Sequence, residues 1–258
     1  MLKKAIFIYL ITLLFYSNTY AQNVIINVTY KEYFDTFKPV QRLAYLYADE
    51  KISFFEEDII NTTEWINKNE DENVKTIMPE IKYNNHLKIN HTNKEVYFFD
   101  QLKSNDYYLI KDNYTNHKWK LINETKKIAN YKCYKAECNF RGRKWIVWYT
   151  PEINVSSGPW KLYGLPGLIL EAYDETRKYN FSAEKITFDK NDKLYTNFSS
   201  FRKEKLSNAT LEQFLVLREE FLDNGFSDLS KERGTITRTN PSRSGKELIY
   251  EWEVQPKK

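Results

Sequence analysis

Apolar and polar residues alternate with a period of two along most of the chain, which is the pattern of half-buried β-strands. The alternation is clear near the start, over residues 24–30. Three pairs of such runs flank short polar turns and predict hairpins: 42–47 with 52–55, 96–99 with 107–110, and 132–140 with 144–149. A further alternation over 248–254 predicts a last strand. Strands joined by short turns indicate an antiparallel sheet.

One segment follows the helical period instead. Thr210, followed three residues later by Gln213, is a capping box, in which each side chain bonds the backbone N–H of the other residue. Apolar residues that fall on one helical face come next: Leu211, Phe214, Leu215, Phe221 and Leu222. Asn224 and Gly225 tolerate the left-handed conformation that ends a helix. The sequence thus predicts a β-rich (α+β) fold, a curved antiparallel sheet or half-barrel with one covering helix near residues 210–224.

The first residues have the features of a secretory signal peptide. Lys3 and Lys4 precede an apolar run over 5–15, which is shorter than the about 20 residues that span a bilayer. We expect cleavage between Ala21 and Gln22, so that residues 1–21 are removed and residues 22–258 form a single domain. No cysteine lies near the cut. We therefore expect a periplasmic or secreted protein that is not a lipoprotein and has no transmembrane segment in its mature chain.

Glycine and proline are scarce and unevenly placed. The chain has 7 Gly and 7 Pro, and half of these fourteen residues lie between positions 142 and 167. An apolar run over 145–149 predicts a central strand buried on both faces. Gly158 and Pro159 then suit the start of a single helical turn, which Gly164 ends. Pro166 and Gly167 fit the central positions of a type II turn, which needs positive φ at the second position.

Residues 164–169 read Gly-Leu-Pro-Gly-Leu-Ile, and further matching residues surround them between positions 128 and 174. On these residues the chain resembles the GLPGLI family of secreted Bacteroidota proteins. The motif residues, which we interpret as mainly structural, are Cys133, Arg141, Gly142, Arg143, Trp148, Pro151, Gly158, Pro159, Trp160, Gly164, Leu165, Pro166, Gly167, Leu168 and Ile169.

The resemblance implies a signal peptide, an envelope location and a β-rich domain, but no reaction. The family also looks distantly similar to the bowl-shaped N-terminal domain of some bacterial peptide N-glycanases. We expect no room in this chain for a second, catalytic domain, and so we expect no such activity.

The net charge of the mature chain argues against nucleic acid as a partner. Removal of Lys3 and Lys4 leaves 37 basic against 35 acidic residues, a net charge of +2, which gives no field that would gather nucleic acid. The basic residues near the end of the chain are interpreted as a solvated loop: Lys231, Arg233, Arg238, Arg243 and Lys246.

The chain has two cysteines, Cys133 and Cys138. On one strand they would point to opposite faces with Cα atoms about 16 Å apart, beyond the limit of about 7 Å for a disulfide. We favour two unbridged thiols, although an oxidising envelope leaves the bridged form open. Their spacing is a poor zinc signal, and we expect no metal and no cofactor.

Catalytic candidates are few. His86 and His91 lie in a polar stretch and are interpreted as exposed loop residues, and His117 carries no motif. Glu152 and Glu171 are the carboxylates inside the motif, and nothing in the sequence pairs them for catalysis. No nucleotide-binding, metalloprotease or serine-hydrolase motif appears.

These observations favour a non-enzymatic binding or carrier-like envelope protein, with a lipid or acyl ligand held on an apolar concave sheet. Two alternatives remain. One is an interaction module that binds another envelope protein within an outer-membrane or secretion complex. The other is a hydrolase that uses carboxylates no motif reveals. Whether the apolar face is a closed core or an open bowl decides the first hypothesis.

Overall fold

The computed structural model describes residues 24–35, 39–59, 64–65, 84–103, 106–189, 206–233 and 245–254. The predicted signal peptide and its cleavage site between Ala21 and Gln22 lie outside these residues, as do Lys3 and Lys4.

The described strands form one sheet. Their bounds are β1 (Ile25–Phe34), β2 (Val40–Ala48), β3 (Ile52–Glu57), β4 (Glu64–Trp65), β5 (Asn85–Asn90), β6 (Glu95–Lys103), β7 (Asp106–Asn113), β8 (Lys120–Ile128), β9 (Tyr131–Phe140), β10 (Arg143–Thr150), β11 (Leu168–Asp174), β12 (Tyr179–Asp189) and β13 (Ser207–Thr210). The strand order is β13-β7-β6-β5-β3-β2-β1-β12-β11-β10-β9-β8, and β4 pairs with β2 to one side. Strand β13 runs parallel to β7, whereas the other pairs are antiparallel.

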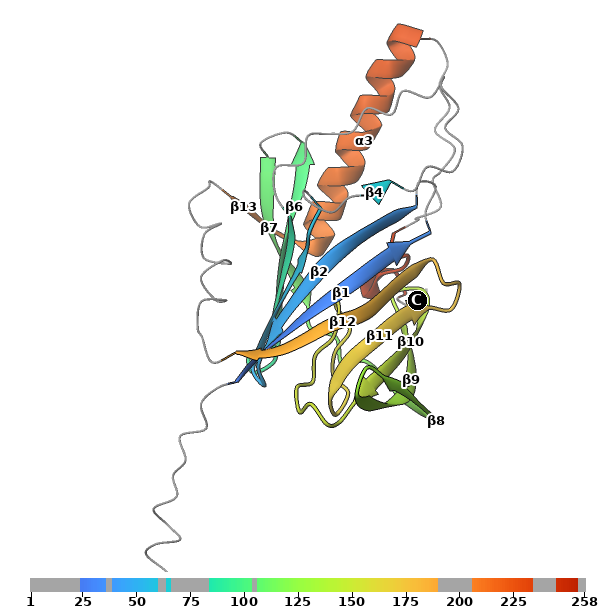
Figure 1. Ribbon diagram of the computed structural model, residues 1–258. Helices are drawn as coiled ribbons and strands as arrows, with labels where there is room; N and C mark the ends of the chain where they lie inside the picture. The colour runs from blue at the N-terminus through green and yellow to red at the C-terminus, as the bar shows by residue number, and fades with distance from the viewer. Residues whose placement is uncertain are drawn as a thin grey trace, which may run out of the picture.

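The sheet is open and curved, which confirms the predicted β-rich fold. In Figure 1, β1, β2 and β12 cross the middle of the molecule, while β6 and β7 stand in one wing and β8 to β11 in the other. The three predicted hairpins are confirmed as β2–β3, β6–β7 and β9–β10. Shifts of register interrupt four pairings, including β1 with β12 at Thr29 and Tyr30. Such bulges increase the local twist, which helps a long sheet to bend.

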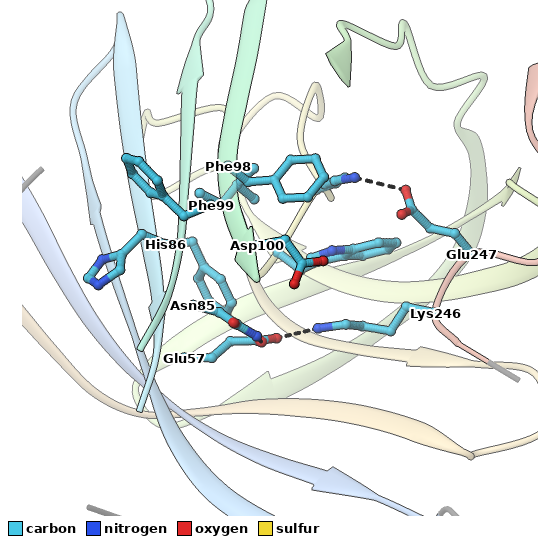
Figure 2. A pocket seen from close by; sticks show the side chains of 12 residues that line it. Glu57, Asn85, His86, Phe98, Phe99, Asp100, Lys246 and Glu247 are labelled. Atoms are coloured by element: carbon cyan, nitrogen blue, oxygen red, sulfur yellow. Dashed lines mark hydrogen bonds and ion pairs between the residues drawn. The ribbon is translucent and has the colours of Figure 1, made fainter. Parts of the chain in front are cut away.

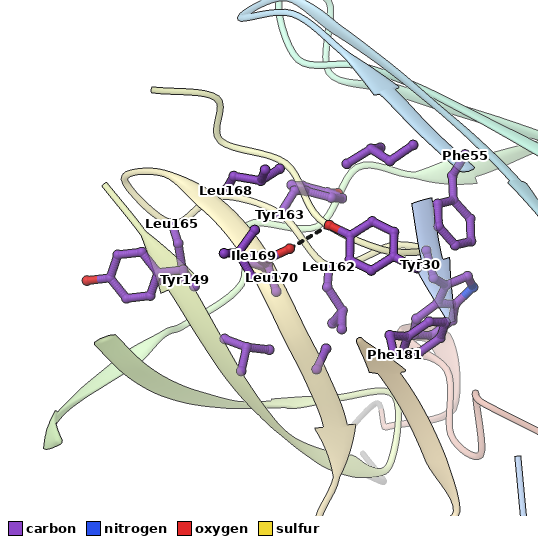
Figure 3. Packing of buried hydrophobic residues seen from close by; sticks show 14 of the residues in the cluster. Tyr30, Phe55, Tyr149, Leu162, Tyr163, Leu165, Leu168, Ile169, Leu170 and Phe181 are labelled. Carbon is purple, nitrogen blue, oxygen red and sulfur yellow. Dashed lines mark hydrogen bonds between the residues drawn. The ribbon is translucent and has the colours of Figure 1, made fainter. Parts of the chain in front are cut away.

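The apolar face of the sheet is a filled core. Strand β1 alternates buried and half-buried residues, and its Tyr30 is 0% exposed. The segment between β10 and β11 covers this face with Leu162 and Leu165, which are also buried. Tyr30 Oη donates a hydrogen bond of 2.5 Å to the carbonyl oxygen of Ile169 and so ties β1 to the start of β11, directly after this segment (Figure 3). Strand β10 lies between β9 and β11, and its Trp145 is 0% exposed, as expected for a central strand.

Two glycines of the motif are required by the backbone. The β9–β10 hairpin turns at Arg141 (φ 46°) and Gly142 (φ 80°), the two positive values of a type I′ turn. Gly167 has φ 140°, and a Cβ there would lie 2.1 Å from the carbonyl oxygen of Thr150. The predicted type II turn is nevertheless wrong at this point. The N–H of Gly167 bonds the carbonyl of Leu165 in a tighter three-residue turn, and that of Leu168 bonds Ile153 instead.

Helix α3 (Leu211–Arg233) begins as predicted. Thr210 N–H donates to Gln213 Oε1 at 2.9 Å, and Gln213 N–H donates to Thr210 Oγ1 at 3.2 Å, which completes the capping box. The predicted end at Asn224 is wrong, because the helix continues through Gly225. A glycine inside a helix costs only about 1 kcal/mol relative to alanine, which is too little to end the helix at this position.

The helix covers the sheet only at its base. Leu211 and Phe214 are buried with Ile110 of β7, whereas Phe221 and Leu222 are 42% and 37% exposed. The predicted apolar face is thus buried only in its first turns, because α3 extends beyond the sheet (Figure 1). No helix among the described residues is both long and apolar enough to cross a membrane.

The predicted last strand over 248–254 is wrong. Tyr250 precedes a 3-10 turn, η2 (Glu251–Glu253), and its N–H donates to Glu253 Oε2 at 2.8 Å. Glu247 and Glu251 both bond the guanidinium of Arg141, and these ion pairs replace strand pairing in this segment. The alternation of apolar residues along 248–254 contains no information about these ion pairs, because Arg141 lies far away in the sequence.

Candidate functional site

A pocket lies where strands β3, β5 and β6 meet the 158–164 turn and the C-terminal segment (Figure 2). It encloses about 550 Å³, including its mouth. Aromatic rings and charged groups share the lining, which consists of Phe55, Glu57, Asn85, His86, Leu87, Phe98, Phe99, Asp100, Trp160, Lys161, Lys246 and Glu247. Among these residues, only Trp160 belongs to the sequence motif.

A strained turn positions Trp160. Its φ is 52°, which is unusual for a bulky residue, and the N–H of Leu162 bonds the carbonyl of Pro159 at 3.2 Å. The predicted helical turn is therefore wrong, because a left-handed residue interrupts it. Gly158 permits the close approach of the chain, since a Cβ there would lie 2.7 Å from the Cβ of Ile169. Strained residues of this kind concentrate at functional sites, where surrounding structure holds them in place.

Glu57 is the buried carboxylate at the end of β3. Arg42 Nη2 lies 2.9 Å from its Oε2, Asn85 Nδ2 donates to the same oxygen at 2.8 Å, and Lys246 pairs with the other oxygen. The neighbouring cations lower the pKa of Glu57 to about 2 despite its burial. Lys246 was expected in a solvated loop, and that interpretation is wrong.

Glu32 of β1 lies behind this group and is 0% exposed. Arg42 Nε donates to its Oε2 at 2.5 Å, while Oε1 has no hydrogen-bond partner among the described residues. Burial, and after it the negative charge of Glu57, raise the pKa of Glu32 to about 7, with Arg42 and Lys246 acting in the opposite direction. Glu32 and Glu57 thus share the single positive charge of Arg42. Of the two carboxylates, Glu57 is the one that ionises readily, because its pKa is lowered while that of Glu32 is raised.

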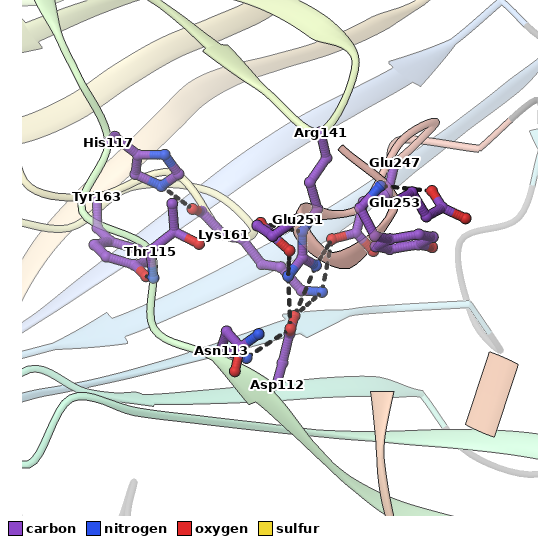
Figure 4. Close-up of polar contacts among 11 residues, drawn as sticks. Asp112, Asn113, Thr115, His117, Arg141, Lys161, Tyr163, Glu247, Glu251 and Glu253 are labelled. Carbon is purple, nitrogen blue, oxygen red and sulfur yellow. Dashed lines mark hydrogen bonds and ion pairs between the residues drawn. The ribbon is translucent and has the colours of Figure 1, made fainter. Parts of the chain in front are cut away.

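A second ionic network closes the other side of the pocket (Figure 4). Arg141 donates to both oxygens of Asp112, at 2.9 and 2.6 Å, and pairs with Glu247 and Glu251. Lys161 Nζ donates to Asp112 at 2.6 Å and to Glu247 at 2.9 Å. Although burial acts to raise it, the pKa of Asp112 is lowered by Lys161 and Arg141. Arg141, predicted as a motif residue, therefore holds the C-terminal segment against β7 beside the pocket.

Asp100 of β6 is the carboxylate of the pocket that lacks a side-chain partner. Within the described ranges, its hydrogen bond comes from the adjacent N–H of Gln101, at 2.7 Å. Burial is the largest cause of its raised pKa. Nearby His86 has a lowered pKa, again chiefly through burial, with Glu56 acting in the opposite direction.

The expectation of an exposed loop residue is wrong for His86, whereas His91 does lie in the turn after β5 but is half-buried there. His86 lies on β5 with its side chain 12% exposed. His91 lies 3.1 Å from Tyr114 Oη and 3.2 Å from Ser157 Oγ. A histidine beside a serine can activate a nucleophile, but Ser157 is 1% exposed and lines neither described pocket. His117 Nε2 donates a hydrogen bond to the carbonyl oxygen of Lys161 at 2.8 Å, since a carbonyl oxygen can only accept.

The carboxylates of the motif are not brought into the pocket. Glu152 accepts a hydrogen bond from the N–H of Lys132 at 2.9 Å and lines a second hollow of about 820 Å³ beside the start of β1. Glu171 pairs with Lys126 at 2.6 Å on the sheet. Neither carboxylate forms a catalytic pair with the other in the contacts of the described residues.

Most other motif residues serve the fold. Leu165, Leu168 and Ile169 are at most 2% exposed in the core. Arg143 bonds Asp174 at 3.0 Å and the carbonyl of Gly245 at 2.7 Å. The Nζ atom of Lys126 lies 4.4 Å from the centre of a ring of Trp148. Pro151 is exposed in the turn after β10.

Cys133 and Cys138 lie on β9 and are both buried and free, as favoured from the sequence. Burial raises the pKa of their thiols to about 11 and about 12. Across the parts of the chain that the structure describes, no three His, Cys, Asp or Glu side chains group in a way that could hold a metal ion.

No sequence pattern pointed to five of the pocket residues, which are Glu57, Asn85, Asp100, Lys161 and Glu247. They come from separate strands and segments with no fixed spacing between them. The one local signal that could have led to the pocket is the aromatic residue inside the Gly/Pro-rich turn.

The fold and the pocket define a class of protein, a curved-sheet β domain whose pocket suits a ligand with both apolar faces and polar groups. A family model described as "N-glycanase peptide, N-terminal domain" matches residues 30–214, and the chain belongs to this family.

Solved structures agree on the fold. The structures of PNGF-II in space groups P21 and C2 match with TM-scores of 0.53 and 0.51, each at 20% identity. Each match covers 77% of this chain, but only 34% and 33% of those chains. The chain thus spans about a third of the length of the structures it matches. Among curated proteins, none matches this sequence.

The family match corrects the sequence-based identification. The resemblance to the GLPGLI family is wrong, because the family that matches is the N-terminal domain of N-glycanases. The expected non-enzymatic carrier of a lipid or acyl group is wrong for the same reason. Among the described residues, the apolar face of the sheet also packs into a filled core. Neither the interaction module nor the carboxylate hydrolase gains support from the comparisons.

Proposed function

We propose that this protein acts in N-glycanase chemistry on N-glycosylated proteins, and that its pocket binds the carbohydrate of the substrate. The observation that carries the proposal is the match to the N-glycanase family over residues 30–214. This range contains all the pocket-lining residues except Lys246 and Glu247. The pocket therefore belongs to the part of the chain that is shared with N-glycanases.

The lining supports a saccharide ligand. A sugar ring offers apolar C–H faces and a rim of hydroxyl groups. Trp160 and Phe98 provide flat apolar walls, which are well suited to such faces. Asp100 and the amide of Asn85 provide acceptors for hydroxyl donors.

We further propose that the protein is periplasmic or secreted and is cut between Ala21 and Gln22. The basic and apolar start of the chain supports this location. We also propose that residues 22–258 act as one domain, in which the motif residues are structural apart from Trp160.

A binding experiment tests the proposed function. The probes are a peptide that carries one neutral N-linked oligosaccharide and the same peptide without it, titrated calorimetrically into the purified protein. We expect binding of the glycosylated peptide only. Asp100→Asn and Phe98→Ala should each weaken this binding about ten-fold, which corresponds to about 1.4 kcal/mol.

The matched control is Glu152→Gln, which also neutralises a carboxylate but lies outside the pocket and should bind like the wild type. Equal affinity for both peptides, or no binding of either, would contradict the proposal. The same samples are then analysed by mass spectrometry for released oligosaccharide, which reports whether this chain alone performs the cleavage.

A further inference from the structure

The two ammonium groups of the pocket are already paired with carboxylates. Lys246 pairs with Glu57. Lys161 Nζ lies 2.6 Å from Asp112 Oδ2 and 2.9 Å from Glu247 Oε1. An anionic ligand would have to break these contacts in order to reach either cation. Breaking a buried ion pair leaves an uncompensated charge and is costly.

Asp100 remains without such a partner. Its carboxylate accepts the N–H of Gln101, and no ion pair reaches it from the described residues. Arg218 and Lys161 act on it only at a distance, and burial outweighs their effect. In Figure 2, Asp100 lies between Glu57 on one side and Phe98 on the other, with Lys246 and Glu247 across the pocket. The uncompensated negative charge of the pocket is therefore at Asp100.

The remaining lining does not offset this charge. The four cations at the pocket are already engaged by the other carboxylates: Arg42 and Lys246 pair with Glu57, and Arg141 and Lys161 pair with Asp112, Glu247 and Glu251. This leaves Asp100 as the carboxylate without an ion pair among the described residues. The aromatic walls contribute faces of partial negative charge, which attract cations and not anions.

We propose that the pocket selects neutral saccharides and rejects those that carry carboxylate or sulfate groups, with Asp100 as the specificity-determining residue. This inference rests on the proposed function, since it assigns the class of sugar that the same pocket binds. A hydroxyl group donates a charge-assisted hydrogen bond to a carboxylate. An anionic substituent at the same place meets like charge, and such juxtapositions discriminate strongly between ligands.

The test is an array on which each neutral N-linked oligosaccharide stands beside its sialylated or sulfated form. The wild-type protein should bind the neutral members at least about ten-fold more tightly. Asp100→Asn keeps the shape of the side chain and removes its charge, so it should bring the two affinities within about three-fold of each other. Raising the salt concentration from about 50 mM to about 500 mM should also narrow the wild-type difference, because salt screens charge repulsion. Glu152→Gln should keep the full difference.

The outcomes separate this inference from the proposed function. Equal wild-type binding of neutral and anionic forms overturns the selectivity and leaves carbohydrate binding intact. An unchanged ratio in Asp100→Asn overturns the role of Asp100. If no oligosaccharide binds, the proposed function fails and the selectivity fails with it. The salt dependence is measured on the unmodified protein, so a variant that fails to fold does not remove the test.

Discussion

Replacement of Arg141 by methionine tests the ionic network that joins the C-terminal segment to the sheet. Arg141 and Asp112 have side chains that are each 1% exposed. Methionine keeps an unbranched apolar stem of similar reach but removes the guanidinium. The variant loses two hydrogen bonds to Asp112, at 2.9 and 2.6 Å, and two to Glu251, at 3.0 and 3.2 Å. It also loses the pairing with Glu247.

The structure sets the size of the effect. Removal of one partner of a buried ion pair costs about 3–5 kcal/mol, because the other charge stays buried. Lys161 still pairs with Asp112 at 2.6 Å, and Glu251 is 42% exposed, so that both reduce the loss. We therefore expect Arg141→Met to lower the free energy of unfolding by about 3 kcal/mol. Arg141→Lys keeps the charge without the planar fork and should fall between this variant and the wild type.

The assay is equilibrium unfolding in urea, followed by tryptophan fluorescence. The control is Lys144→Met, which removes a cation on the neighbouring strand whose pairs with Glu137 and Glu175 lie at the surface. Exposed pairs contribute little, and this variant should unfold close to the wild-type midpoint. If Arg141→Met and Lys144→Met unfold at the same urea concentration, the buried network does not stabilise the fold as argued.

Three further results are expected. Gly167→Ala should destabilise the protein by more than about 2 kcal/mol, because φ is 140° and the Cβ meets a carbonyl oxygen. Gly245→Ala, whose Cβ would lie 3.8 Å from the nearest contact that the described part of the chain offers, should change urea stability by less than about 0.5 kcal/mol. Glu32 has a pKa raised from 4.5 to about 7, so the folded state holds a proton that the unfolded chain releases in this window. The contribution of Glu32 to the free energy of unfolding should therefore fall as the pH rises from 4.5 to 7, so the stability of the wild type relative to Glu32→Gln should fall across this range; a difference that does not change with pH contradicts the assignment. Cys133 and Cys138 should resist alkylation at pH 8 in the native protein and take up two labels in denaturant without reductant, while a mass with fewer labels would indicate a disulfide.

Local sequence patterns were sufficient where local contacts decide the structure. The alternation of residues predicted the three hairpins, because a strand with one buried face needs an apolar residue at every second position. The capping box of Thr210 and Gln213 depends only on residues three apart and is formed as expected. The same kind of pattern failed over 248–254, where ion pairs to Arg141 override the alternation.

Local patterns were enough to predict the class of fold, the turn at Arg141 and Gly142, and the start of the helix. The pocket and the closed core could not be predicted in this way, because they depend on contacts between segments that are far apart in the chain. Glu57 and Lys246 meet across 189 positions, and Tyr30 and Ile169 across 139. Short-range periodicity reports which face of a strand is buried, but it carries no record of which distant side chain completes an ion pair or covers that face.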